Sequence, residues 1–134
     1  MDDDLKTTRG IQNLFDGLSE NGEIEKITEG EWTSAVYRNK SFYLSKYDTE
    51  SKKLIRMEED FCTCLAINQS HHYRGSQWPG YQNLVFDEFI PETDEGYLVE
   101  EFDKFTNLCH TVKRHKTGFK IWLLGNTINK YNLY

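Results

Sequence analysis

The chain has 134 residues, of which 37% are hydrophobic and 28% are charged, and its formal net charge is −6. That length fits one ordinary domain, and the acidic balance argues against a protein that grips nucleic acid by itself, because phosphate-binding surfaces are normally basic. No run of apolar residues approaches the roughly 18 that a membrane helix needs, and the acidic start is unlike a signal peptide. We therefore expect a cytoplasmic protein with no membrane partner.

Residues 1–30 form a polar and charged N-terminal segment with one weakly specified amphipathic helix. Asn21-Gly22 is a turn dipeptide that would end this helix, and Gly10 and Gly17 lower its helix propensity. Its apolar positions are Ile11, Leu14, Phe15 and Leu18.

Residues 31–68 change to a period of two that is typical of β-strands. Strand-forming residues occur at 35–37, 41–44 and 54–57, with polar turns between them. The pattern predicts a β-meander or a pair of hairpins. The stretch 62–67 could continue this sheet or begin a short helix, and residues 69–82 read as a loop.

Residues 83–128 carry the pattern of a parallel βαβ unit. A short apolar strand at 83–86 runs into Asp87-Glu88, a helix is predicted over 98–115, and a second strand at 119–124 runs into Gly125-Asn126. In such units the crossover is right-handed and ligands gather at the carboxyl ends of the strands. Both polar clusters fall at those ends.

An apolar strand that ends in Asp-Glu has the form of a Walker B motif. Asp87 would hold Mg²⁺ through coordinated water, because Mg²⁺ dehydrates reluctantly, and Glu88 would orient or deprotonate the water that attacks the γ-phosphate of ATP. Asn126 could contact that water or the phosphate, and Arg114 could stabilise phosphoryl charge in its own or a neighbouring site. Taken singly, each residue also has an ordinary interpretation: solvated loop carboxylates, turn chemistry at Asn126, and a helix C-terminal cation at Arg114.

Four segments in this order resemble the podovirus-type DNA encapsidation ATPases, the terminase-like motors that package genomes into small tailed-phage capsids. The resemblance is strongest from 83 to 134 and implies Walker B and catalytic carboxylates at Asp87 and Glu88, a trans-acting arginine finger at Arg114, and a coupling motif at Asn126. It also implies Mg²⁺ and ATP as cofactors, including nucleotide contacts of Asp87 and Asn126. The segments are 84–90, 105–108, 111–114 and 123–127.

The chain departs from that family because it has no phosphate loop, neither G-x-x-x-x-G-K-[ST] nor a relaxed form of it. We therefore expect a single partial ATPase-like domain over 1–134, an incomplete P-loop NTPase-type α/β fold that hydrolyses ATP poorly or not at all alone. Its partners would be full-length motor or portal subunits and other copies of itself, with double-stranded DNA bound only in the complete assembly. The alternative is a non-catalytic, phage- or prophage-derived interaction module that binds a motor or portal subunit.

The cysteines and histidines suggest further sites that the sequence leaves open. Cys62-x-Cys64 with His71-His72 invites a zinc interpretation, although structural zinc sites usually have C-x₂₋₄-C spacing. Cys109 could pair with a histidine as a nucleophile, but it falls on the apolar stripe of the predicted helix.

Overall fold

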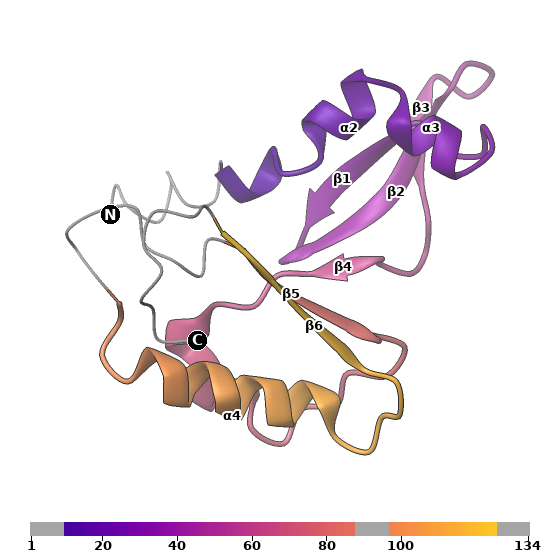
Figure 1. Cartoon of the computed structure of the whole chain (residues 1–134). Helices are drawn as coiled ribbons and strands as arrows, with labels where there is room; N and C mark the ends of the chain where they lie inside the picture. Colours follow the sequence, from indigo (N-terminus) through magenta and orange to yellow (C-terminus); the bar gives the residue numbers. More distant parts are fainter. Residues whose placement is uncertain (1–9, 88–96, 126–134) are drawn as a thin grey trace. The chain divides into compact units, whose positions relative to one another are not determined.

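The computed structural model describes residues 10–87 and 97–125. The chain forms two compact units, unit 1 (residues 1–64) and unit 2 (residues 65–134). Figure 1 labels their helices and strands in chain order. None of the helices in the described ranges has the length and apolar character of a membrane-spanning segment.

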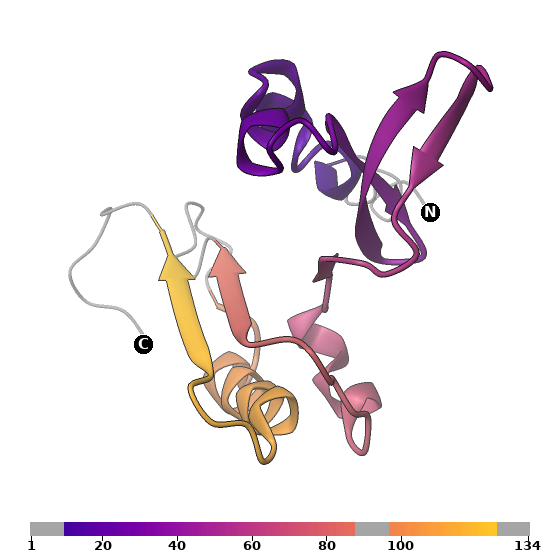
Figure 2. The same ribbon diagram turned by 90° about the vertical axis from the view of Figure 1, so that its right-hand side faces the viewer.

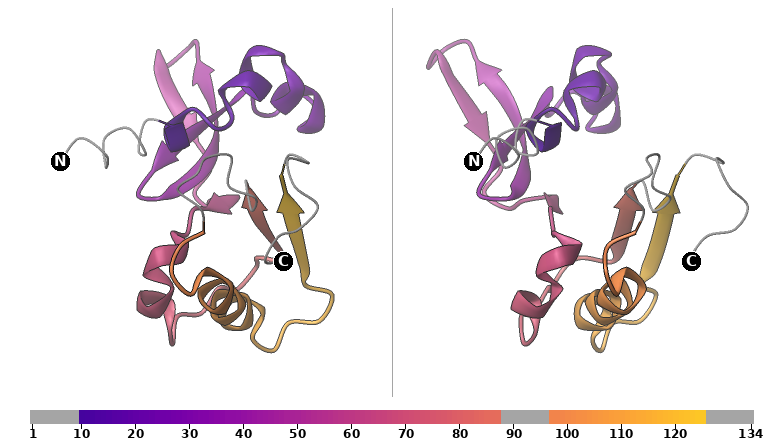
Figure 3. Two further views of the ribbon diagram at one scale, coloured as in Figure 1. Left: turned by 60° about the vertical axis from the view of Figure 1, so that its left-hand side comes forward. Right: turned by 90° about the vertical axis from the view of Figure 1, so that its left-hand side faces the viewer.

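The N-terminal helix expected in unit 1 is interrupted by a turn and ends before Asn21-Gly22 as predicted, and a further short helix that the sequence did not predict follows it. Residues 10–12 are helical, a turn follows, and then come α2 (Asp16–Glu20) and α3 (Glu23–Ile27). Gly22 separates α2 from α3 with φ of 71°, a left-handed conformation that favours glycine. Figure 3 shows the two helices as separate short turns of ribbon.

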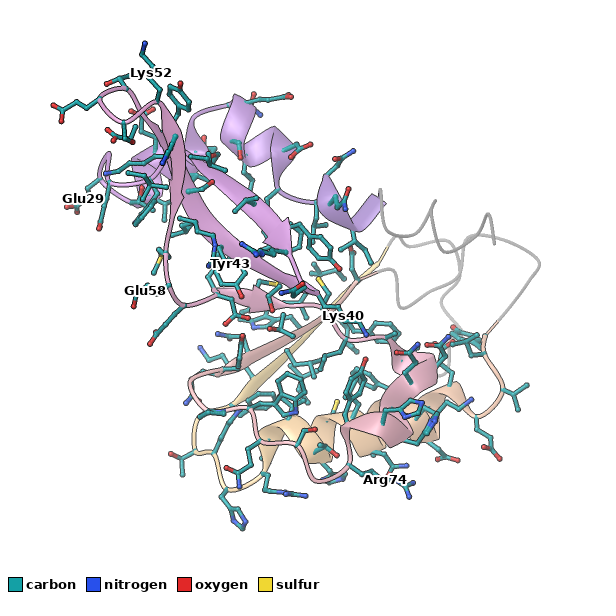
Figure 4. The ribbon with its side chains drawn as sticks, turned by 180° about the vertical axis from the view of Figure 1, so that it is seen from behind. Glu29, Lys40, Tyr43, Lys52, Glu58 and Arg74 are labelled. Atoms are coloured by element: carbon teal, nitrogen blue, oxygen red, sulfur yellow. The ribbon has the colours of Figure 1, made fainter. Side chains whose placement is uncertain are left out.

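Unit 1 contains an antiparallel sheet, as its period-two pattern predicts. The strands are β1 (Ser34–Arg38), β2 (Ser41–Asp48), β3 (Lys53–Arg56) and β4 (Cys62–Thr63), and β2 pairs with the other three. Asn39 and Lys40 join β1 to β2 with φ of 52° and 63°, the left-handed pair that a tight hairpin turn requires. Lys40 and Lys52 mark the turns at the two ends of β2 (Figure 4).

An aromatic cluster forms the core of unit 1 around Phe42, whose exposed fraction is 0%. The ring of Phe15 meets it edge to face at 4.7 Å between centroids, and Tyr37 on β1 lies at 5.0 Å. Phe61 contacts Phe15 at 5.1 Å. Aromatic pairs of this kind add to the stabilisation that burial provides. The cluster thus holds the N-terminal segment against the sheet.

Unit 2 begins with η1 (Ile67–Tyr73), a 3₁₀-helix where the sequence suggested a loop from residue 69. The Ala66 amide donates a hydrogen bond to the Tyr73 hydroxyl at 3.1 Å, which closes the segment on itself. Short 3₁₀ turns of this kind are common connectors and carry little sequence signal.

The remainder of unit 2 is the expected parallel βαβ unit. Its elements are β5 (Asn83–Asp87), α4 (Glu101–Lys113) and β6 (Lys120–Leu124), and β5 and β6 pair in parallel. Figure 2 shows both strand arrows pointing the same way. The helix begins three residues after the start of the predicted range and ends two residues before its end. The Glu101 carboxylate accepts a hydrogen bond from the Leu98 amide at 2.8 Å, which fixes the helix start.

The helix α4 packs against β5. Phe105, Leu108 and Val112 are buried, and the Phe105 ring stacks on Phe86 of β5 at 4.8 Å between centroids. The apolar stripe of the sequence predicted this packing. The fold class is therefore mixed α/β, with an antiparallel sheet followed by a parallel βαβ unit; its identity as a P-loop NTPase-type domain stays a prediction.

Candidate functional site

The candidate metal ligand Asp87 is the last residue of β5. It lies opposite Leu124 in the register, so both strands end at the same edge of the sheet. Successive side chains on a strand point to opposite faces, and Phe86 packs on α4, so Asp87 lies on the other face, where it is exposed. A carboxylate at this point can bind a hydrated cation.

Two other predicted site residues, Glu88 and Asn126, lie outside the described residues. Their roles in orienting water and in contacting phosphate stay predictions. The parallel pairing of β5 and β6 nevertheless agrees with the arrangement on which those predictions depend, since it brings the carboxyl ends of both strands to one edge.

Arg114 lies at the opposite end of unit 2 from Asp87. It is the C-cap of α4, and the crossover helix runs back against the direction of the strands. The helix has 13 residues, a length of about 20 Å at a rise of 1.5 Å per residue. One chain therefore does not bring the Arg114 guanidinium to the Asp87 carboxylate, although Arg114 is exposed and can reach another molecule.

A hollow of about 330 Å³ lies beside Arg114, between the loop 76–82 and the end of α4. His115, Lys116 and Trp78 also line it. The Trp78 Nε1 and Lys116 Nζ atoms are buried and have no hydrogen-bond partner among the described residues. Burial lowers the pKa of Lys116, whose Nζ lies 5.4 Å from the centroid of the Phe119 ring. The sequence did not predict that these residues lie together, because some 30 positions separate the loop from the end of α4.

The sheet face opposite α4 is apolar and open. Val85, Trp122 and Leu124 have exposed fractions of 57%, 50% and 48%. The Trp122 indole donates a hydrogen bond to Asn83 Oδ1 at 3.0 Å across this face. Parallel sheets are almost always covered on both faces. This face therefore has the character of an interaction surface.

The candidate zinc ligands belong to different units. Cys62 and Cys64 lie in unit 1, and His71 and His72 lie on η1 of unit 2 with their ring centroids 3.9 Å apart. Within residues 10–87 and 97–125, no group of three or more histidine, cysteine or acidic side chains is placed to hold a metal ion. The zinc interpretation gains no support from the described residues.

Cys109 does not have the environment of an activated nucleophile. It is half-buried on α4, and burial raises the pKa of its thiol to about 11. A catalytic cysteine needs a lowered pKa, because the thiolate is the reactive form. Cys109 is a packing residue of the helix.

Comparisons with protein-family models, with curated proteins and with solved structures give no match to this chain.

Proposed function

We propose that the chain is a part of a DNA-packaging motor ATPase of the terminase type, and that it supplies the metal- and water-handling half of an ATP site. The observation that supports this most is the parallel β5–α4–β6 unit with Asp87 at the carboxyl end of β5. Ligands of open α/β sheets bind at that edge. In the complete assembly, ATP hydrolysis would drive double-stranded DNA into a viral capsid.

Each proposed site residue has one role in this mechanism. Asp87 fits a magnesium site because it is an exposed carboxylate, and Mg²⁺ in nucleotide sites is commonly held by one or two carboxylates, water and phosphate. Bound Mg²⁺ would neutralise phosphate charge. Glu88 positions and deprotonates the attacking water, and Asn126 links the state of the phosphate to the rest of the motor.

Arg114 would act on a neighbouring subunit. The length of α4 separates it from Asp87 in the same chain, so an arginine finger from this position has to enter another copy's site. Such arginines contribute roughly 10³- to 10⁵-fold to the rate where they act. The separation thus favours a homo-oligomer with sites shared between copies.

Calorimetric titration of Mg²⁺-ATP into the full chain tests this function. We expect weak, saturable binding that needs Mg²⁺ and is lost in Asp87→Asn, which keeps the size of the side chain and removes its charge. Glu59→Gln, which removes the same charge from an exposed position in unit 1, is the matched control and is expected to bind as the unsubstituted chain does. Absence of binding up to millimolar ATP would rule out an ATP site that works in this chain alone, and equal binding by Asp87→Asn would refute the proposed role of Asp87.

The second candidate function is a non-catalytic interaction module that binds a motor or portal subunit. The open apolar face of Val85, Trp122 and Leu124 favours it, because such a surface needs no nucleotide to be useful. Under this function, Trp122→Ala would abolish association with a motor or portal subunit while Asp87→Asn leaves association intact. Association that is unchanged by Trp122→Ala would refute this second function.

A further inference from the structure

Two thiols of unit 1 lie side by side on one strand face. Cys62 belongs to β4 and pairs with Phe42 of β2, and the Cys64 amide donates a hydrogen bond to the Lys40 carbonyl at 2.8 Å, so the extended chain continues through residue 64. Side chains two positions apart on a strand project to the same face. The thiols of Cys62 and Cys64 are therefore neighbours, close enough for each to shift the pKa of the other.

The residue between the two thiols anchors this strand. Thr63 points to the other face, where its hydroxyl hydrogen-bonds with the Ser41 hydroxyl at 2.8 Å and donates to the Asp60 carboxylate at 2.6 Å. On the thiol face, Cys62 adjoins the buried ring of Phe42. Both cysteines are half-buried, so a small reagent can reach them. The pair is thus held at the rim of a packed core and is still accessible.

The interaction between the two thiols makes them unequal. It lowers the pKa of Cys64, while the same interaction and burial raise the pKa of Cys62. As the pH rises, Cys64 is therefore the thiol that ionises first. A low-pKa, accessible cysteine beside a second cysteine is the arrangement found in redox-sensing proteins.

We propose that Cys62 and Cys64 form a reversible dithiol–disulfide pair that small-molecule disulfides oxidise. The Cys64 thiolate attacks one sulfur of a disulfide RSSR, which forms a mixed disulfide and releases RS⁻. Cys62 then attacks the Cys64 sulfur, and the second RS leaves as the thiol RSH with the proton from Cys62. Overall, one thiol, one thiolate and RSSR become a protein disulfide, RS⁻ and RSH; the cysteines are oxidised by two electrons and RSSR is reduced.

Strand geometry makes this disulfide labile. Residues two apart on a strand are separated by about 6.6 Å between Cα atoms, near the upper end of the range of about 4.4–6.8 Å that a disulfide spans. Closing the bond pulls Cys64 toward Cys62 and weakens the hydrogen bond to the Lys40 carbonyl. Strained disulfides are readily reduced, which suits a bond that forms and breaks in a reducing compartment.

The remaining cysteine, Cys109, is an internal control for the reaction. The pKa of Cys64 is lowered by its interaction with Cys62, whereas burial raises the pKa of Cys109, so Cys64 has the larger thiolate fraction at pH 7. We therefore expect Cys64 to react more than tenfold faster than Cys109. The comparison is made within one folded chain and needs no variant.

The test is incubation of the full chain with glutathione disulfide at pH 7, followed by intact mass and peptide mapping. We expect loss of two hydrogens, a Cys62–Cys64 bond, and its reversal by reduced glutathione. Cys62→Ser is expected to stop at one stable glutathione adduct on Cys64, Cys64→Ser to lose most of the reaction, and Cys109→Ser to behave as the unsubstituted chain. Modification of Cys109 at a similar rate, bonds only between separate chains, or unmodified Cys64 would each overturn the proposal.

Discussion

Replacing Phe42 with alanine is expected to be the most damaging single change in unit 1. Complete burial of a phenylalanine side chain contributes about 2–3 kcal/mol. The ring contacts with Phe15 and Tyr37 each add about 0.5–1.5 kcal/mol. The sum agrees with the usual loss of about 3–5 kcal/mol when a core phenylalanine becomes alanine. A loss of that size is a large part of the stability of a small domain, about 5–15 kcal/mol.

This loss in the free energy of unfolding is measured by urea denaturation and, in a second experiment, by hydrogen exchange of the β1 and β2 amides. The matched control is Tyr47→Ala, because Tyr47 is an aromatic residue of the same strand with an exposed fraction of 60%. We expect Tyr47→Ala to lower the free energy of unfolding by less than about 1 kcal/mol. If Phe42→Ala and Tyr47→Ala lose stability equally, the aromatic cluster is not the core of unit 1 and the reasoning is wrong.

Three further predictions concern helix ends, glycines and thiols. Glu101→Ala is expected to cost about 1 kcal/mol in urea denaturation, because the Leu98 amide loses its acceptor, whereas Glu101→Gln keeps an acceptor oxygen and loses less. Gly17→Ala is expected to raise the free energy of unfolding by about 0.5–1 kcal/mol, since it lies inside α2 with nothing within 4 Å of an added Cβ. Gly22→Ala is expected to lower the free energy of unfolding by about 1 kcal/mol, because Gly22 has a φ of 71° that strains an alanine. Equal effects of the two alanine substitutions in thermal unfolding would contradict this prediction. Raising the pH deprotonates thiols, so the rate of iodoacetamide alkylation is expected to rise at a lower pH for Cys64, whose pKa is lowered, than for Cys109, whose pKa burial raises to about 11. Superimposed profiles would refute the assignment.

Local patterns in the sequence sufficed to predict the βαβ unit. The strands at 83–87 and 120–124 are short apolar runs, and the helix between them has Phe105, Leu108 and Val112 at helical spacing. Each element is encoded by adjacent residues, and the chirality of the crossover leaves few ways to arrange them. Asp87 could be placed at a strand end for the same reason.

The features that escaped prediction depend on contacts between distant residues. The N-terminal helix breaks where Phe15 packs on Phe42, a tertiary contact that overrides the weak propensity of a segment containing Gly10 and Gly17. The placement of the Cys62 and Cys64 thiols on one face follows from the pairing of β4 with β2, and a C-x-C spacing alone does not show it.

The opposed directions of α4 and the strands give unit 2 an electrical polarity. Asp87 and Asp103 lie at the end where the strands finish and the helix begins, whereas Lys113, Arg114 and Lys116 lie at the other end. These side-chain charges oppose the helix macrodipole and so stabilise α4, yet they leave the unit with a negative pole and a positive pole. A charged molecule that approaches unit 2 in dilute buffer therefore meets a different electrostatic potential at each end, and this difference fades above about 0.1 M salt, where the screening length falls to about 10 Å.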